Sequence, residues 1–247
     1  MKVSIAGFKE LSLIDVHGHT SFTLWFCGCN LLCPFCHNWR LTINDPGVCR
    51  EEDVDEIISM LSISSPLIEY LHITGGEPLL QLEPLMDLYV KSKSVGVLNS
   101  LNTNLTMPAQ LEVLLSRNLI EHLATDLKVP FPEMSGLGSL SEHQWTQFMQ
   151  SLSILKKYRV VVELRIPVAK SITLKYLHNY LSKVSDAIHS LWEVYVVVNP
   201  LIGAPMLSPR NPAWAEQHCN PSASEVEEVA KVVKEVLGVK VYTKKWW

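Results

Sequence analysis

The rest of the chain is best understood from residues 26–38, which read Phe-Cys-Gly-Cys-Asn-Leu-Leu-Cys-Pro-Phe-Cys-His-Asn. Cys29, Cys33 and Cys36 follow the spacing Cys-x3-Cys-x2-Cys, and no fourth cysteine closes the set. Ferredoxin-type clusters are held by four cysteines. Three thiolates can hold three irons of a cubic [4Fe–4S] cluster, so the spacing predicts a cluster whose fourth iron is open to another ligand.

Composition limits the class of protein. At 247 residues the chain fits one large domain, and 47% apolar residues are enough for a sizeable core. The formal charge of −4 and the pI near 6.1 give no basic field, so nucleic acid is not expected as a partner. No apolar run approaches the roughly 18 residues of a membrane span, and we expect no membrane association.

The cysteine count points to a reducing compartment. Four of the six cysteines lie within ten residues, too crowded for a conventional disulfide framework, and no secretory signal precedes them. We therefore expect a cytoplasmic protein. Cys27, Cys49 and Cys219 are scattered, and each is expected to be a small buried hydrophobic residue rather than part of a second cluster.

Apolar strands alternate with amphipathic helices along the chain, which predicts a parallel sheet covered by helices. Six or seven such units fall short of a complete eight-fold barrel, so we expect an α/β fold with a partial (β/α)6 barrel. Residues 1–247 should form one domain with a core at about 20–200. A helix and strand extension over 221–247 would follow, with Ser224 and Glu227 as a capping box and Trp246-Trp247 tucked against the barrel.

Polar residues follow most of the expected strands. Because sites gather at the carboxyl ends of parallel strands, these residues should meet at one mouth. Surface solvation or ion pairing is the competing explanation for them. They are Gly75-Gly76-Glu77, Asn104, Asp126, Lys128, Arg165 and Asn199. Arg165 lies in an otherwise apolar strand, where a buried charge needs a partner.

Two other sites could use these cysteines. A zinc site would need a fourth ligand, such as His37, Cys27 or a distant residue. A thioredoxin-like redox pair of Cys33 and Cys36 would leave Cys29 unexplained. A glycine pair and a glutamate after the next strand favour the cluster, because glycines let a ligand approach the backbone and a carboxylate can accept hydrogen bonds from an amine.

Together, the cysteine triplet and Gly75-Gly76-Glu77-Pro78 resemble the radical S-adenosylmethionine (SAM) enzymes. The resemblance implies a [4Fe–4S] cluster on Cys29, Cys33 and Cys36, and SAM chelating the open iron through its amine and carboxylate. It also implies that Gly75, Gly76 and Glu77 bind the SAM amine, and that Phe35 lies near the adenine. The SAM carboxylate would be a suitable partner for the buried charge of Arg165. Ordinary core packing is the alternative for Phe35.

The resemblance narrows further at Cys33-Pro34-Phe35-Cys36-His37-Asn38, which is similar to the activases of glycyl-radical enzymes. Asp126-Leu127-Lys128 resembles an activase segment that lies beside SAM and the substrate peptide. The stretch from Gly7 to Gly18 resembles the activating protein of anaerobic ribonucleoside-triphosphate reductase. Cys27 and Asn102-Thr103-Asn104 depart from the usual subfamily pattern.

The implied activity is reductive cleavage of SAM to a 5′-deoxyadenosyl radical that generates a glycyl radical on a partner such as anaerobic ribonucleotide reductase. An external donor such as flavodoxin or ferredoxin would supply the electron. A second hypothesis is a small-molecule radical SAM enzyme such as 7-carboxy-7-deazaguanine synthase. A third, from a different class, is a zinc-stabilised binding module without catalysis.

Overall fold

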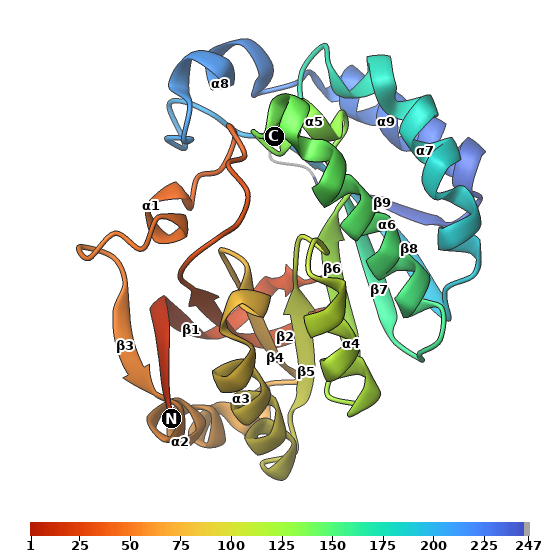
Figure 1. The fold of residues 1–247 in the computed structure, drawn as a ribbon. Helices are drawn as coiled ribbons and strands as arrows, with labels where there is room; N and C mark the ends of the chain where they lie inside the picture. The colour runs from red at the N-terminus through yellow and green to blue at the C-terminus, as the bar shows by residue number, and fades with distance from the viewer. Residues whose placement is uncertain (245–247) are drawn as a thin grey trace. The chain divides into compact units, whose positions relative to one another are not determined.

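The computed structural model describes residues 1–244, which fall into two compact units (Figure 1). Unit 1 comprises Met1–Asn30 and Asn38–Ala124, and unit 2 comprises Leu31–His37 and the chain from Thr125 onward. The packing expected for Trp246-Trp247 lies outside the described residues, and the single domain expected over residues 1–247 stays a prediction. None of the helices in residues 1–244 combines the length and apolar character of a membrane span.

Unit 1 is built on a mixed sheet. Its strand order is β3 (Arg50–Asp53), β1 (Lys2–Val16), β2 (His19–Phe26), β4 (Tyr70–Gly75), β5 (Leu98–Asn102) and the start of β6 (His122–Asp126). Strands β2, β4, β5 and β6 run parallel, as the alternating pattern predicted. The antiparallel pairing of β1 with β2 and β3 was not predicted. Strand β3 was missed because its Arg-Glu-Glu-Asp sequence has no apolar alternation, and β1 is its pairing partner in the sheet.

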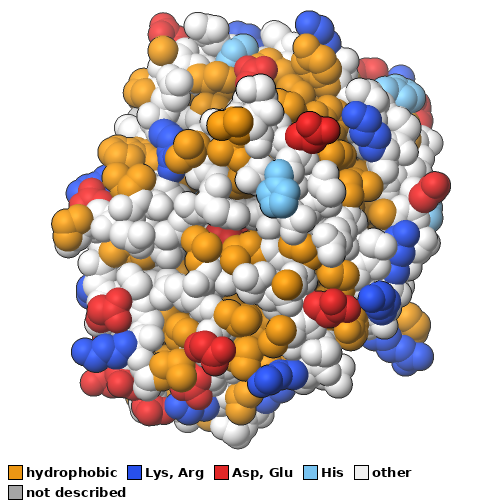
Figure 2. Space-filling view, in the orientation of Figure 1, with side chains coloured by type: hydrophobic (Ala, Val, Ile, Leu, Met, Phe, Trp, Pro, Cys, Tyr) orange, Lys and Arg blue, Asp and Glu red, His pale blue; other side chains and the backbone are white. Residues whose placement is uncertain are grey.

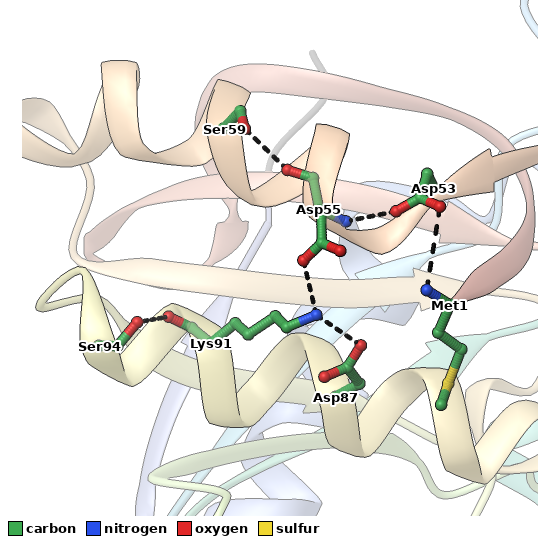
Figure 3. A network of polar contacts seen from close by, with 7 residues as sticks. All are labelled: Met1, Asp53, Asp55, Ser59, Asp87, Lys91 and Ser94. Carbon is green, nitrogen blue, oxygen red and sulfur yellow. Dashed lines mark hydrogen bonds and ion pairs between the residues drawn. The ribbon is translucent and has the colours of Figure 1, made fainter.

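The helices of unit 1 are α1 (Trp39–Thr42), α2 (Val54–Ser64), α3 (Leu82–Ser94) and α4 (Pro108–Ser116), with short 3-10 turns at Ser65–Leu67 and Pro78–Gln81. An ionic network links α2 to α3 (Figure 3): Lys91 Nζ lies 2.6 Å from Asp55 Oδ1 and 2.9 Å from Asp87 Oδ2. The Asp53 carboxylate caps α2 by accepting from the Asp55 N–H. The buried side chains of β2 and β4, such as Leu24 and Ile73, form the apolar core beneath.

Unit 2 carries three parallel strands in the order β7 (Val161–Val168), β8 (Glu193–Pro200) and β9 (Lys240–Thr243). Its helices are α5 (Phe131–Met134), α6 (Glu142–Leu155), α7 (Thr173–His189), α8 (Pro212–His218) and α9 (Ala223–Leu237), with a 3-10 turn at Gly138–Ser141. The capping box of α9 is Ser222 with Glu225, so the prediction of Ser224 with Glu227 was wrong by two residues. Gly238 ends α9 in the left-handed conformation, as expected for a helix stop.

The described surface carries charges of both signs. Figure 2 shows acidic and basic side chains intermixed over the face in view, rather than gathered into a single-sign patch on that face. This distribution agrees with the small net charge of −4 and gives no support to a nucleic-acid interface on that face.

Candidate metal centre

In unit 1, the end of β2 delivers the chain to Cys29. The Gly28 N–H donates to the Leu41 carbonyl (2.9 Å), and the Cys29 N–H donates to the Thr42 carbonyl (3.1 Å). These acceptors lie at the end of α1, where helical carbonyls have no partner within the helix. The short helix that follows the cysteine stretch therefore fixes the backbone of Cys29.

The Gly75-Gly76-Glu77 segment lies directly against this part of the loop. The Gly76 N–H donates to the Phe26 carbonyl (2.9 Å), and the Glu77 N–H donates to the Gly28 carbonyl (2.8 Å). A Cβ added to Gly76 would lie 2.7 Å from the Gly28 carbonyl carbon and 3.4 Å from Cys29 Cβ. Glycine is therefore required at this position for close backbone approach, and the structure brings Gly76 and Cys29 together.

Glu77 is fully buried and joins two segments that the sequence singled out separately. Its Oε1 accepts from Thr103 Oγ1 (2.8 Å) and from the Leu79 N–H (3.1 Å), and its Oε2 accepts from the Asn104 N–H (2.7 Å). The predicted site residues Glu77 and Asn104 are thus in direct contact. The three protein donors give this carboxylate a structural task that sequence reasoning missed, and its binding of the SAM amine stays a prediction.

One cysteine prediction was wrong. Cys27 and Cys49 were expected to be separate buried hydrophobic residues, but a disulfide joins them. The prediction failed because 22 residues separate the two positions in sequence and only the pairing of β1 with β2 and β3 brings them close. Cys29, Cys33, Cys36 and Cys219 remain thiols, and Cys219 is buried as expected.

In unit 2, backbone hydrogen bonds clamp the part of the loop that carries Cys33 and Cys36. The Leu32 N–H donates to the Ser135 carbonyl (2.9 Å), and the Asn211 N–H donates to the Pro34 carbonyl (3.0 Å). The Arg210 N–H donates to the Cys36 carbonyl (2.9 Å). Sequence reasoning missed these contacts, because residues 135, 210 and 211 lie far from residues 32–36 in the chain. The Asn-Pro start of α8, where the Asn211 side chain caps the Trp214 N–H, was the available signal.

Phe35 is partly buried and packs against an apolar cluster. Its ring centroid lies 6.2 Å from that of Trp214, and the cluster behind it contains Met134, Ala169 and Ile172. This is the core packing weighed from the sequence, and the contact of Phe35 with adenine stays a prediction. A pocket of about 510 Å³, lined in part by Leu32, Pro34 and Trp214, adjoins this segment.

Charged residues of unit 2 lie near Cys33. Lys128 Nζ is 3.2 Å from Asp126 Oδ2, and only 5% of Lys128 is exposed. Burial raises the pKa of the Cys33 thiol to about 11, an effect that the positive charge of Lys128 opposes. The thiol is therefore protonated at neutral pH without metal, and iron binding has to displace the proton, as thiolate ligation requires.

The remaining predicted residues lie on β7 and β8. Arg165 Nε is 2.5 Å from Glu163 Oε1. Burial lowers the pKa of Arg165, but the Glu163 carboxylate raises it by more, so the net shift is upward. Asn199 lies near the end of β8, and its buried Oδ1 accepts no hydrogen bond from the described residues. A buried amide oxygen of this kind needs a partner, which fits a polar ligand at the carboxyl end of β8.

The thiols of the triplet are chemically suited to iron–sulfur ligation. Within residues 1–244, no group of three or more His, Cys, Asp or Glu side chains is arranged around one ion, as a zinc site requires. A cubic cluster instead takes one thiolate for each of several irons. Cys29, Cys33 and Cys36 stay the predicted cluster ligands, and the buried Asn199 amide oxygen has no hydrogen-bond partner among the described residues.

Known proteins share this sequence pattern. Residues 24–184 match the model of the radical SAM superfamily. A Methanocaldococcus jannaschii protein, provisionally named a glycyl-radical enzyme activating enzyme, is 29% identical over 168 residues, which are 67% of this chain and 68% of that protein. A pyruvate formate-lyase-activating enzyme of Staphylococcus epidermidis is 36% identical over 111 residues, 42% of each chain. A 7-carboxy-7-deazaguanine synthase of Hyperthermus butylicus is 37% identical over 95 residues, 37% of each chain.

Solved structures share the fold. Streptococcus suis SuiB bound to S-adenosylmethionine has a TM-score of 0.62 at 10% identity, covering 88% of this chain and 48% of that one. The α/β fold class with parallel strands and outer helices is thereby confirmed as that of radical SAM proteins. The family uses a [4Fe–4S] cluster and SAM, which are the cofactors expected from the cysteine spacing. Because the family model matches well over half of the residues, this chain belongs to the radical SAM superfamily.

Proposed function

We propose that this enzyme is a glycyl-radical-enzyme activating enzyme, with a partner such as anaerobic ribonucleotide reductase. The observation that carries the proposal is the similarity over 67% of the chain to a protein named as such an enzyme. The Cys36-His37-Asn38 sequence and the Asp126-Leu127-Lys128 segment support it, since both resemble activases. We also propose one radical SAM domain over residues 1–247, a cytoplasmic setting, and flavodoxin or ferredoxin as electron donor.

The residues would divide the work as follows. Cys29, Cys33 and Cys36 hold the cluster, while Gly75, Gly76 and Glu77 receive the SAM amine. When bound, the cluster and SAM supply a 5′-deoxyadenosyl radical that abstracts hydrogen. Phe35 packs beside the adenine, and further polar groups orient SAM and exclude water from it. These are Asn104, Asp126, Lys128, Arg165 and Asn199.

The test uses anaerobically reconstituted protein, dithionite, SAM and a purified anaerobic ribonucleotide reductase. A glycyl radical doublet in the EPR spectrum of the reductase is expected, and Cys33→Ala should abolish both the doublet and the cluster absorbance. Cys219→Ser serves as the matched control. Cys219 is a buried thiol far from the triplet in sequence, so its replacement should leave both signals intact. SAM cleavage without a glycyl radical on any glycyl-radical enzyme would refute the activase proposal.

A second candidate is 7-carboxy-7-deazaguanine synthase, favoured by the 37% identity over 95 residues to the enzyme of that name. The Gly76-Glu77-Pro78-Leu79-Leu80-Gln81 sequence also resembles that family. His37 speaks against it, because that family usually has aspartate after the third cysteine. Turnover of 6-carboxytetrahydropterin by the reconstituted protein would establish this alternative. Stoichiometric zinc without iron and sulfide, after anaerobic purification, would refute the radical chemistry and leave the zinc-stabilised binding module as the hypothesis to test.

A further inference from the structure

We propose that Glu163 and Tyr195 are positioning residues that hold the Arg165 guanidinium in the orientation in which it binds the carboxylate of SAM. This inference rests on the proposed function of Arg165 as a partner for that carboxylate. It assigns a role to two residues that the sequence did not single out.

The contacts form a chain across two neighbouring strands. In the parallel pairing of β7 with β8, Glu163 lies beside Tyr195. Glu163 Oε1 accepts from Arg165 Nε at 2.5 Å, and Glu163 Oε2 accepts from the Tyr195 hydroxyl at 2.9 Å. Glu163 is fully buried. Both carboxylate oxygens therefore have a fixed donor, and Tyr195 prevents the carboxylate from turning away from Arg165.

This arrangement sets the plane of the guanidinium. Residues i and i+2 of a strand face the same side, so Glu163 reaches the Nε edge of Arg165 from its own strand. Because the guanidinium is planar and rigid, fixing Nε also fixes the direction of its two amino groups. A ligand carboxylate takes two parallel N–H bonds from such a group, and this geometry tolerates little rotation.

A backbone contact within unit 2 ties Arg165 to the segment that carries Asp126 and Lys128. The Leu127 N–H donates to the Arg165 carbonyl at 2.8 Å, which ties the Asp126–Lys128 segment to β7. Asp126 and Lys128 both act electrostatically on the Cys33 thiol. Two carboxylates and two cations, Glu163 and Asp126 with Arg165 and Lys128, balance in charge here.

A buried ion pair of this kind is weak evidence for stability, since hydrophobic residues often serve as well. An orienting role explains why charged groups occupy this place in the fold. Removing the orienting group should then weaken SAM binding by about tenfold or more, the size of loss seen when the hydrogen-bond partners of metal ligands are removed.

The test measures the SAM dissociation constant of the cluster-loaded protein by equilibrium dialysis. Glu163→Asp keeps the charge but shortens the side chain, so SAM affinity should fall at least about tenfold with iron and sulfide content unchanged. Tyr195→Phe removes one hydrogen bond and should cost about twofold to tenfold. Glu193→Asp is the matched control, because Glu193 is exposed on the same strand as Tyr195 and should leave affinity unchanged.

A double-mutant cycle separates positioning from a general structural effect. If Glu163 acts through Arg165, Glu163→Asp should cause no further loss in an Arg165→Lys background. Wild-type affinity in Glu163→Asp, or an equal loss in both backgrounds, would overturn the inference while leaving the proposed function intact. If Glu163→Asp does not fold, wild-type affinity in Tyr195→Phe overturns the inference. Failure of the wild-type protein itself to bind SAM would instead overturn the proposed function.

Discussion

Gly136 lies against the cysteine loop in unit 2, and Gly136→Ala is expected to cost the protein its cluster. A Cβ at this position would lie 2.5 Å from the Leu32 carbonyl carbon, whereas real Cβ contacts essentially never fall below 3.0 Å. Either the loop or the Gly136 backbone must therefore shift by at least 0.5 Å, the difference of these two distances, and the Leu32 carbonyl oxygen lies nearer still. Cys33 follows Leu32 directly, and metal-ligand distances tolerate only about 0.2 Å of displacement.

Gly138 supplies a matched control. Both glycines have the left-handed backbone conformation, with φ of 74° at Gly136 and 54° at Gly138, but a Cβ on Gly138 would meet nothing within 4 Å. The conformational cost of alanine, about 1–2 kcal/mol, is common to both variants. Gly136→Ala also strains the hydrogen bond from the Leu32 N–H to the Ser135 carbonyl, which adds about 0.5–1.5 kcal/mol.

The assay is anaerobic reconstitution followed by iron and sulfide analysis and visible absorbance. Gly138→Ala should take up cluster like the wild type, and Gly136→Ala should take up several-fold less while both remain folded by circular dichroism. Urea unfolding should show Gly136→Ala as the less stable of the two. A folded Gly136→Ala protein with full cluster content would refute the reasoning that this contact positions Cys33.

Three further outcomes are expected. Glu77→Gln should lower the free energy of unfolding in urea by about 1.5–3 kcal/mol, because the amide NH2 would replace an oxygen that accepts a hydrogen bond and would face a protein donor. An unchanged urea midpoint of unfolding would contradict this. Lys91→Met should lower the unfolding midpoint slightly, and less at high salt. The Lys91 hydrogen bond lowers the pKa of Asp55, so this stabilisation is present above that pKa and should vanish as pH falls through it; a pH-independent effect would argue against the pair. Cys49→Ser should cost about 3 kcal/mol by releasing the loop closed with Cys27, and thiol labelling of both cysteines in the native wild type would exclude that disulfide.

Much of the fold could be predicted because its signals are local. The apolar faces of α7 and α9 follow from helical spacing, since Leu181 and Val184, and Val229 and Val233, recur at intervals of three or four residues and are buried. The capping box of α9 shows the limit of such reasoning. Two Ser-x-x-Glu pairs overlap in sequence, and only the extended backbone of Ser222 decides where the helix begins.

The candidate site divides in the same way. Cysteine spacing and the position of Gly75-Gly76-Glu77 after a strand were sufficient to predict the family. Neither could show that Glu77 reaches Thr103 and Asn104, because these residues lie in a different loop. The pairing of Phe35 with Trp214 was equally inaccessible, since 179 residues separate them (214 minus 35).

The sequence by itself therefore determined the family of this protein: three cysteines at a fixed spacing, and glycines where a backbone must come close. The cysteine spacing can be interpreted from the sequence because neighbouring residues in a short loop stay near each other in any fold. Tertiary structure alone decided which distant residues contact one another around these segments. The Cys27–Cys49 disulfide, the backbone hydrogen bonds of residues 32–36 and the contacts of Glu163 with Arg165 and Tyr195 join segments that lie apart in sequence or side chains of one sheet face. Such contacts depend on strand register and chain packing, which local patterns do not specify.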